Sequence, residues 1–228
     1  MSSPATPESP HKIPVRITHW INVLCFVAFV ISGIGILRAH PRFYWGEVGY
    51  FDMPAAFELP LAVNKHHTSW GRWVHFTAAW IAILNGLAYL AWGFYSRHFK
   101  ITFLPSRTQL AWQQIKAVLG EHLRFQKPTH APSYNLLQKL AYISVVFILF
   151  PLIILTGLTM SPGFTSPFPQ LFTIFGGRQS ARTIHFFASN ALLLFVAIHL
   201  LMITLAGFRK SILGMTTAPY STSVQEEK

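Results

Sequence analysis

Three segments of the sequence share a pattern of an arginine, two intervening residues, a histidine and an aromatic residue. They read RITHW at 16–20, RWVHF at 72–76 and RTIHF at 182–186. A further histidine, His199, follows His185 by fourteen positions on an almost entirely apolar stretch. Imidazole is costly in such surroundings unless it serves a site, and it is a ligand of haem iron. The pattern therefore favours ligand sites, although any single histidine could be a hydrogen-bonded packing residue.

Helical spacing relates these groups to one another. His185 and His199 would be separated by about 21 Å along a helix and about 40° around it, so they share one face. Each arginine lies one turn from its histidine on the same face. There a guanidinium could pair bidentately with a haem propionate. Arginines at helix ends also act as snorkelling anchors, but the threefold repetition favours propionate pairing by Arg16, Arg72 and Arg182.

Membrane-spanning helices are the elements that must position these side chains. Of the 228 residues, 52% are hydrophobic and 11% charged, and the mean hydropathy is +0.40, which is typical of membrane proteins. A spanning helix needs about 20 apolar residues. Such runs occupy about 17–37, 73–95, 140–160 and 184–208. We expect an all-α integral membrane protein, with a four-helix bundle over 1–215 and a tail over 216–228.

The cysteine content restricts which disulfides and cofactors the chain can have. The single cysteine, Cys25, excludes an internal disulfide, a Cys-only iron–sulfur site and c-type haem attachment. We expect it to be a packing residue.

The first span follows a polar, Pro-rich stretch without a small-residue cleavage site, so it should be a retained helix. The third span contains no histidine, and we expect it to pack, with a kink at Pro151.

The distribution of lysine and arginine predicts the orientation. The segment between the second and third spans is basic, with Arg97, Lys100, Arg107, Lys116, Arg124 and Lys127. Basic residues also precede the first span and follow the fourth, so both termini should be cytoplasmic in a bacterial inner membrane. The formal net charge of +11 is then a topology signal and a basis for contact with membrane lipid. No nucleic-acid-binding module is recognisable.

This orientation pairs the ligands. His19 opens the first span on the cytoplasmic side, to which the fourth span returns near His199. His75 and His185 open the second and fourth spans from the outer face. A bundle that builds cofactor sites from facing helices should therefore enclose two b-type haems, one near each surface. The other histidines should be solvated loop residues; they are His11, His40, His66, His67, His98, His122 and His130. The adjacent pair His66 and His67 lies close enough to the second span to compete with His75 as a ligand.

The chain resembles the b-type cytochrome subunits of nickel-iron hydrogenases, respiratory formate dehydrogenase and thiosulfate-reductase-like enzymes. The resemblance covers all four spans. It implies haem ligation by the histidines that match the family's ligands in order, namely His19, His75, His185 and His199.

Two shorter stretches extend this resemblance. YNLLQK at 134–139 is similar to the family's stretch beside the cytoplasmic haem, where quinone binds, and KSILGM at 210–215 is similar to its end. The resemblance implies quinone contacts from Asn135 and Gln138 near His199, whereas Asn135 could equally cap a helix. Leu137 is a departure, because formate dehydrogenase members have glycine there.

The loop over 38–69 contains HPRFYWGEVGYF and is similar to that of members encoded beside molybdopterin oxidoreductases of the sulfite-oxidase type. Its aromatic residues suit a protein contact or an interfacial aromatic belt. We expect an electron-transfer subunit, not a catalytic one, between the quinone pool and a periplasmic redox enzyme. Two alternatives stay open: a stand-alone quinone-linked oxidoreductase such as a superoxide oxidase, and a haem-free metal transporter. The separate ligand depths and the missing midplane carboxylate disfavour the transporter.

Overall fold

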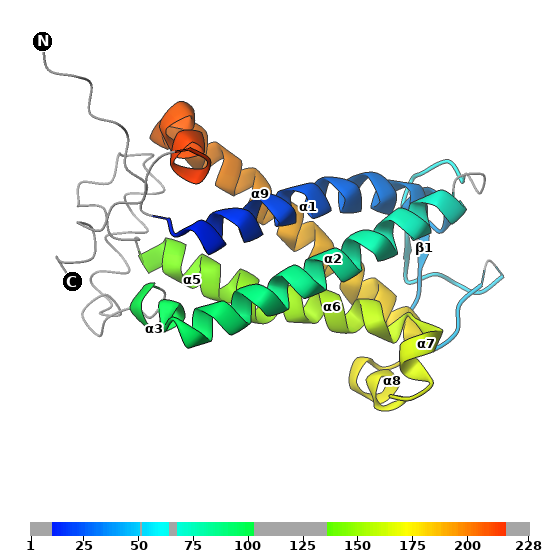
Figure 1. The fold of residues 1–228 in the computed structure, drawn as a ribbon. Coiled ribbons are helices and arrows are strands. Elements are labelled where there is room, and N and C mark those ends of the chain that lie inside the picture. The colour runs from blue at the N-terminus through cyan, green and yellow to red at the C-terminus, as the bar shows by residue number, and fades with distance from the viewer. Residues whose placement is uncertain (1–10, 51, 64–67, 103–135, 218–228) are drawn as a thin grey trace, which may run out of the picture. The chain divides into compact units, whose positions relative to one another are not determined.

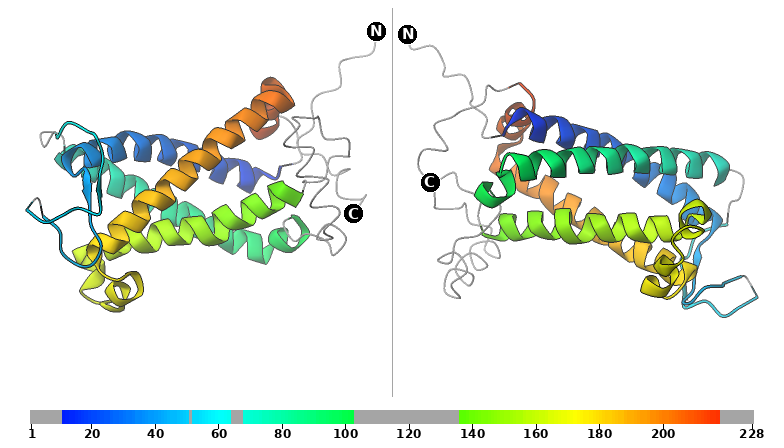
Figure 2. Two further views of the ribbon diagram at one scale, coloured as in Figure 1. Left: turned by 180° about the vertical axis from the view of Figure 1, so that it is seen from behind. Right: turned by 60° about the horizontal axis from the view of Figure 1, so that its bottom comes forward.

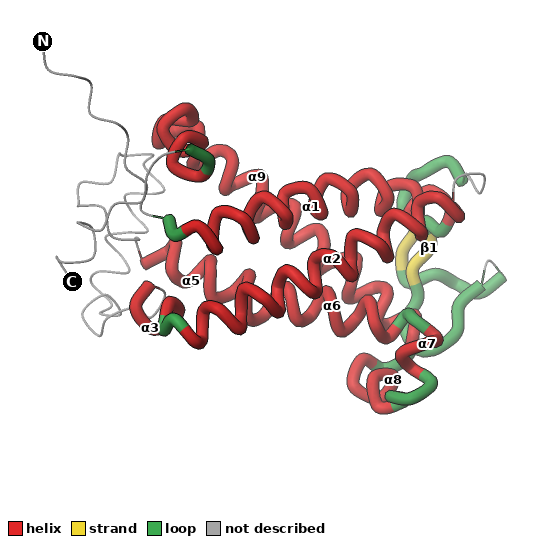
Figure 3. Tube along the Cα trace, in the orientation of Figure 1, coloured by secondary structure: helices red, strands yellow, loops and turns green. Residues whose placement is uncertain are grey.

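The computed structural model describes residues 11–50, 52–63, 68–102 and 136–217. Helices dominate these residues, with one small pair of strands (Figures 1 and 3). In chain order the elements are α1 (Ile13–Ala39), β1 (Arg42–Phe43), β2 (Phe57–Glu58), α2 (Thr68–Tyr95), α3 (His98–Thr102), α5 (Leu136–Ser144), the π-helical turn η1 (Val145–Leu149), α6 (Phe150–Thr159), α7 (Pro162–Thr165), α8 (Gln170–Phe175) and α9 (Arg178–Met215).

Four helical segments of the described residues are long and apolar enough to cross a membrane. They are Ile13–Ala39, Trp70–Tyr95, Gln138–Thr159 and Arg178–Arg209. The predicted four spans are thereby confirmed. The helices begin before the predicted positions because their first turns carry polar and basic residues, which a search for apolar runs leaves out. The division of the chain at residue 215 stays a prediction.

The third span is continuous but irregular. A π-helical turn, Val145–Leu149, separates α5 from α6 directly before Pro151. Proline has no backbone N–H to donate, and its ring clashes with the carbonyl four residues earlier in a regular α-helix. A π-helical turn is one recognised irregularity that accommodates such a break. The π-helical turn lies next to the residue where a kink was predicted, and the kink itself stays a prediction.

The chain divides into two compact units. The first comprises Met1–Trp20, Gly86–Val145 and Val196–Lys228, and the second comprises Ile21–Asn85 and Val146–Phe195. We call them the His19 unit and the His75 unit after the first predicted ligand in each. The His19 unit also contains His199 and the His75 unit also contains His185. Both members of each predicted pair therefore lie in the same unit.

A small hairpin organises the loop of the His75 unit. The strands pair antiparallel, with Arg42 opposite Glu58 and Phe43 opposite Phe57. The first pair forms an ion pair with a nitrogen–oxygen distance of 2.9 Å. The second pair stacks at 4.6 Å between ring centroids, and Phe43 also lies 4.6 Å from the ring of Phe186 on α9. Phe43 is 1% exposed, so the hairpin closes over an aromatic contact with α9.

The same loop is fixed to the start of α9 by its backbone. The carbonyl oxygen of Gly46 accepts hydrogen bonds from the N–H groups of Gln179 and Ser180, and the N–H of Gly46 donates to Ser180 Oγ at 2.7 Å. Gly177 has a φ of 101°, and a Cβ there would lie 2.5 Å from the Gly46 carbonyl. Only glycine allows this backbone conformation and this approach.

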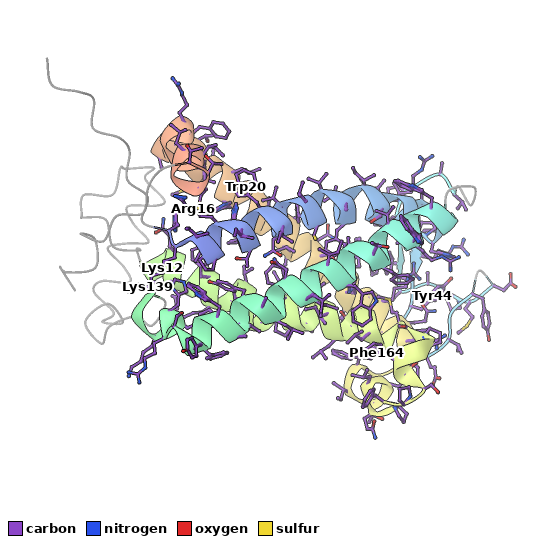
Figure 4. The ribbon with its side chains drawn as sticks, in the orientation of Figure 1. Lys12, Arg16, Trp20, Tyr44, Lys139 and Phe164 are labelled. Carbon is purple, nitrogen blue, oxygen red and sulfur yellow. The ribbon has the colours of Figure 1, made fainter. Side chains whose placement is uncertain are left out.

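In the His19 unit, α9 changes direction at Gly207, which has the non-helical angles φ 108° and ψ 91°. The terminal segment after this residue is turned away from the preceding part of the helix (Figure 2). The indole N–H of Trp20 donates to the carbonyl of Met215 at 2.9 Å. Arg16 donates to the carbonyl of Thr216 at 3.3 Å. The terminal segment therefore covers the start of α1, where Figure 4 labels Arg16 and Trp20.

Candidate functional site

His75 on α2 and His185 on α9 face each other in the His75 unit. Their ring centroids are 6.3 Å apart and their planes are inclined by 59°. A metal–imidazole bond is about 2.0–2.1 Å long, and with a ring radius of about 1.1 Å, two imidazoles on one ion have centroids about 6.3 Å apart. The spacing therefore fits a single metal ion bound between the two rings.

The second ring nitrogen of His75 is held by α1. His75 Nδ1 lies 3.0 Å from Ser32 Oγ. The hydroxyl of Ser32 donates to the carbonyl of Ala28 at 2.6 Å, so its oxygen is left to accept from the imidazole. His75 therefore carries its proton on Nδ1, and its Nε2 lone pair is available to a metal.

The second ring nitrogen of His185 is held by α6. His185 Nδ1 lies 3.0 Å from the carbonyl oxygen of Ile153 and 3.0 Å from Thr156 Oγ1. A carbonyl oxygen only accepts hydrogen bonds, so Nδ1 must be the donor. A Cβ at Gly157 would lie 3.5 Å from His185 Cε1, an ordinary van der Waals contact, so the ring packs closely against this part of α6. His185 also presents the Nε2 lone pair.

The His19 unit holds a second facing pair. The ring centroids of His19 on α1 and His199 on α9 are 6.4 Å apart, with planes inclined by 55°. Trp20 meets the His19 ring edge-on at 5.5 Å. His19 Nδ1 is buried, and among the described residues it has no hydrogen-bond partner. The pair has the same single-ion spacing as the first, although the surroundings of its ring nitrogens differ.

The donor set of each pair fits haem. Within the described ranges, no group of three or more histidine, cysteine, aspartate or glutamate side chains could hold a metal ion. Two imidazoles alone leave the coordination of a transition metal incomplete. A porphyrin supplies the remaining nitrogen ligands, and bis-imidazole ligation within helical bundles is a known use of histidine. Both pairs therefore fit a b-type haem.

The three arginines predicted to pair with haem propionates have different surroundings. Arg182 donates to the carbonyl oxygens of His40 and Arg42, and its guanidinium lies 4.7 Å from the centroid of the Phe43 ring. Arg182 thus fastens the loop to α9 in the His75 unit. Arg16 holds the terminal segment of α9, and Arg72 is exposed. Propionate pairing by these arginines stays a prediction.

Of the two residues predicted to contact quinone, the structure describes one. Asn135 lies outside the described residues, whereas Gln138 is exposed on α5 in the His19 unit. The adjacent Lys139 is buried. Both quinone contacts stay predictions.

The expectation that the other histidines are solvated loop residues is wrong for His98 and for His11, which are both half-buried. Arg97 has a φ of 54°, which reverses the chain after α2 and places His98 against it. The His98 ring lies 4.9 Å from Trp92 and 6.3 Å from Tyr89. Burial, with smaller contributions from Lys12 and His11, lowers the pKa of His98 to about 4.

The remaining histidines are as follows. His40 is exposed, and its carbonyl accepts from Arg182. His11 is half-buried, and burial, followed by the nearby His19 and Arg16, lowers its pKa. The residues at 66, 67, 122 and 130 lie outside the described ranges, so competition of His66 or His67 with His75 stays a prediction.

Sequence reasoning missed the groups that hold the ring nitrogens. Ser32, Ile153 and Thr156 were not predicted as site residues, and the third span was expected only to pack. That expectation is incomplete, because α6 supplies both partners of His185 Nδ1. The available signal was a hydroxyl side chain inside an apolar span. Such a residue could partner the second nitrogen of a ligating histidine, but hydroxyls also bond to their own helix.

The chain is similar in sequence to known proteins. The family model described as prokaryotic cytochrome b561 matches residues 11–218. A relative in Azospira oryzae, named as the protein-methionine-sulfoxide reductase subunit YedZ1, is 32% identical over 203 residues, which are 86% of this chain and 90% of the relative. A relative in Cupriavidus necator, named as a Ni/Fe-hydrogenase B-type cytochrome subunit, is 23% identical over 214 residues, 90% of this chain and 80% of the relative.

These matches confirm the resemblance seen in the sequence and cover both units and all four spanning helices. The family binds haem b in the membrane and transfers electrons. The chain therefore belongs to the prokaryotic cytochrome b561 family, as a multi-pass membrane protein that carries haem and electrons.

Proposed function

We propose that this chain is the electron-transfer subunit of an oxidoreductase complex and moves electrons across the bacterial inner membrane between the quinone pool and a periplasmic enzyme. The observation that carries the proposal is the occurrence of two facing imidazole pairs, at 6.3 and 6.4 Å, in two separate units of one chain. A chain with two such sites is equipped to pass electrons between two cofactors rather than to hold a single one.

Each pair has a defined role in this proposal. His75 and His185 hold one haem, and His19 and His199 hold the other. When bound, each haem supplies reversible one-electron transfer, which the protein tunes through the axial ligands, hydrogen bonding and burial. The apolar residues of the four spans keep both sites away from bulk water.

The proposed orientation of the chain in the membrane depends on the distribution of its basic residues. If both termini are cytoplasmic, the His19–His199 haem lies near the cytoplasmic surface and the His75–His185 haem near the periplasmic one. Quinone would then exchange electrons at the His19 unit, where Asn135 and Gln138 are the proposed contacts. The periplasmic enzyme would exchange electrons at the His75 unit.

The names of the relatives support a partner. One is named as a reductase subunit and the other as a hydrogenase cytochrome subunit. The loop of the His75 unit offers a contact surface, since Trp45, Val48 and Tyr50 are all more than half exposed. Aromatic residues are enriched at protein interfaces. We propose that this loop binds the partner, which by the resemblance of the loop is a molybdopterin oxidoreductase.

The first test is a dithionite-reduced minus oxidised spectrum of the purified chain, with pyridine haemochrome quantification. We expect two b haems per chain. One haem per chain would remove the transmembrane path, and folded protein without haem would favour the metal transporter.

A second test separates a subunit from a stand-alone oxidoreductase. Membranes containing the chain and a quinol should reduce the partner enzyme, and Trp45→Ala should weaken that coupling about tenfold if the residue is a binding hot spot. Purified chain that oxidises superoxide or a quinol at a physiological rate without any partner would favour the stand-alone alternative.

A further inference from the structure

We infer that Ser32, Thr156 and the Ile153 carbonyl are positioning groups that lower the reduction potential of the haem held by His75 and His185. This inference rests on the proposed function, because it requires a haem between the two rings. It assigns a role in the redox chemistry to α1 and α6, which supply no ligand of this pair.

The hydrogen-bond geometry fixes the proton on each ring. Ser32 Oγ has one proton, which is directed to the Ala28 carbonyl 2.6 Å away, with Phe29 O farther away at 3.3 Å. Its oxygen therefore accepts from His75 Nδ1. Thr156 plays the same part toward His185, because its hydroxyl donates to the Leu152 carbonyl at 2.7 Å and its oxygen accepts from His185 Nδ1. Both hydroxyls are bonded to their own helix and act as acceptors toward the imidazoles.

Burial makes these contacts hard to replace. Ser32 and Thr156 are both 0% exposed. A buried donor that loses its acceptor suffers the full cost of desolvation. The two hydroxyls thus favour the tautomer of each imidazole whose Nε2 lone pair would be available to a haem iron.

The electronic consequence follows from the donor character of Nδ1–H. An imidazole that donates this hydrogen to an oxygen is a more basic ligand through its other nitrogen. A more basic ligand stabilises the ferric state over the ferrous state, so the reduction potential falls. Removal of the acceptor should therefore raise the potential of this haem.

The two histidines should differ in their sensitivity. Among the described residues, His75 Nδ1 has Ser32 as its hydrogen-bond partner, whereas His185 Nδ1 has both Thr156 and the Ile153 carbonyl. Loss of the Ser32 hydroxyl leaves His75 Nδ1 without this acceptor. Loss of the Thr156 hydroxyl leaves His185 one acceptor on the backbone, so the effect of Thr156→Val should be smaller.

The experiment is a potentiometric titration of the full chain in detergent, followed in the α-band, for wild type, Ser32→Ala, Thr156→Val and Ser189→Ala. Ser189 is the matched control, because its hydroxyl lies one turn from His185 on α9 and donates to the His185 carbonyl at 2.7 Å. Ser32→Thr restores a hydroxyl at position 32. The haem content of each variant is measured by pyridine haemochrome.

We expect Ser32→Ala to raise the potential of one haem and leave the other unchanged, Thr156→Val to raise the same potential by less, and Ser189→Ala to change neither. Ser32→Thr should return the potential toward the wild-type value. Unchanged potentials at unchanged haem content, or an equal shift in Ser189→Ala, would overturn the inference. Wild type without haem would instead refute the proposed function.

If Ser32→Ala loses its haem, Thr156→Val decides the question, because valine keeps the volume of threonine and His185 keeps the Ile153 carbonyl. A raised potential in that variant supports the inference, and an unchanged one refutes it.

Discussion

The two imidazole pairs have nearly the same spacing but different second contacts. In the His75 unit both Nδ1 atoms have an oxygen at 3.0 Å. In the His19 unit, the buried Nδ1 of His19 has no hydrogen-bond partner within the described residues, and its ring instead contacts Trp20 edge-on. Equal spacing of the imidazoles therefore does not make equal sites, because the helices behind the rings set their hydrogen bonding.

The two units also close their sites differently. In the His75 unit, the 38–63 stretch of the loop is fixed to α9 by Arg182 and by the hydroxyl of Thr183, which donates to the Tyr44 carbonyl at 2.8 Å. Figure 4 labels Tyr44 on this loop. In the His19 unit, the terminal segment of α9 takes that role through Trp20 and Arg16. One site is closed by a long connection and the other by the end of its own ligand-bearing helix.

The largest expected effect is the loss of one haem from each single ligand variant. His75→Ala and His185→Ala should each abolish the same haem, and His19→Ala and His199→Ala should each abolish the other, because one imidazole cannot hold the iron in a bis-histidine site. Haem content by pyridine haemochrome and the low-temperature α-band spectrum of each variant measure this.

His40→Ala is the control, since its side chain is exposed, and it should retain both haems. If the two variants of one pair remove different haems, the pairing and therefore the comparison of the two units are wrong.

A substitution at Gly157 should affect the His75–His185 site alone. A Cβ there would make an ordinary contact of 3.5 Å with His185 Cε1, so Gly157→Ala should retain the haem. The γ carbons of valine would enter the space of the ring, so Gly157→Val should displace His185 and reduce the content of that haem by at least half. Spectra of the two variants side by side test this, and retention of full haem by Gly157→Val would contradict it.

A substitution at Gly207 should weaken the His19–His199 site. Gly207 has a φ of 108°, and a non-glycine residue in such a conformation costs about 1–3 kcal/mol. Gly207→Ala should therefore loosen the segment that accepts from Trp20 and lower the temperature at which this haem is released.

Gly214→Ala is the matched control, because Gly214 lies on the same segment without a positive φ, and a Cβ there would meet nothing within 4 Å. Thermal release followed in the α-band measures both variants. Equal release temperatures for the two would show that Gly207 is not required for the turn.

The smallest effect should be a pH dependence in the His19 unit. The pKa of His98 is lowered from 6.5 to about 4, so between these values the unfolded chain binds more protons than the folded one. Stability should therefore be full above pH 6.5 and fall as the pH decreases toward 4. His98→Phe keeps an aromatic ring against Trp92 without this titration.

The melting temperature of wild type should fall relative to that of His98→Phe when the pH is lowered from 7.5 to about 4.5, within the window between the two pKa values. A constant difference across this range would show that His98 does not titrate with folding.

Much of the helical framework, and the histidines that form the two facing pairs, could be predicted from particular residues. Apolar runs long enough to cross the bilayer locate the helices, because lipid offers no partner for unpaired backbone groups. The Arg-x-x-His-aromatic repeats then place histidines at defined depths. Pro151 marked an irregular turn because proline cannot donate to the helix. The partial burial of His98 against α2 was missed, since it depends on the left-handed conformation of Arg97, which no local pattern indicated.

The number of spanning helices and the set of candidate histidine ligands follow from the sequence alone, because hydrophobic length and helical period are local properties. The sequence did not indicate that Ser32 and Thr156 approach the candidate ligands, that His185 packs against Gly157 or that Arg182 holds the loop. These contacts join residues far apart in the chain, and their formation depends on how the side chains of different helices fit together. That fit is what makes the surroundings of the two imidazole pairs unequal.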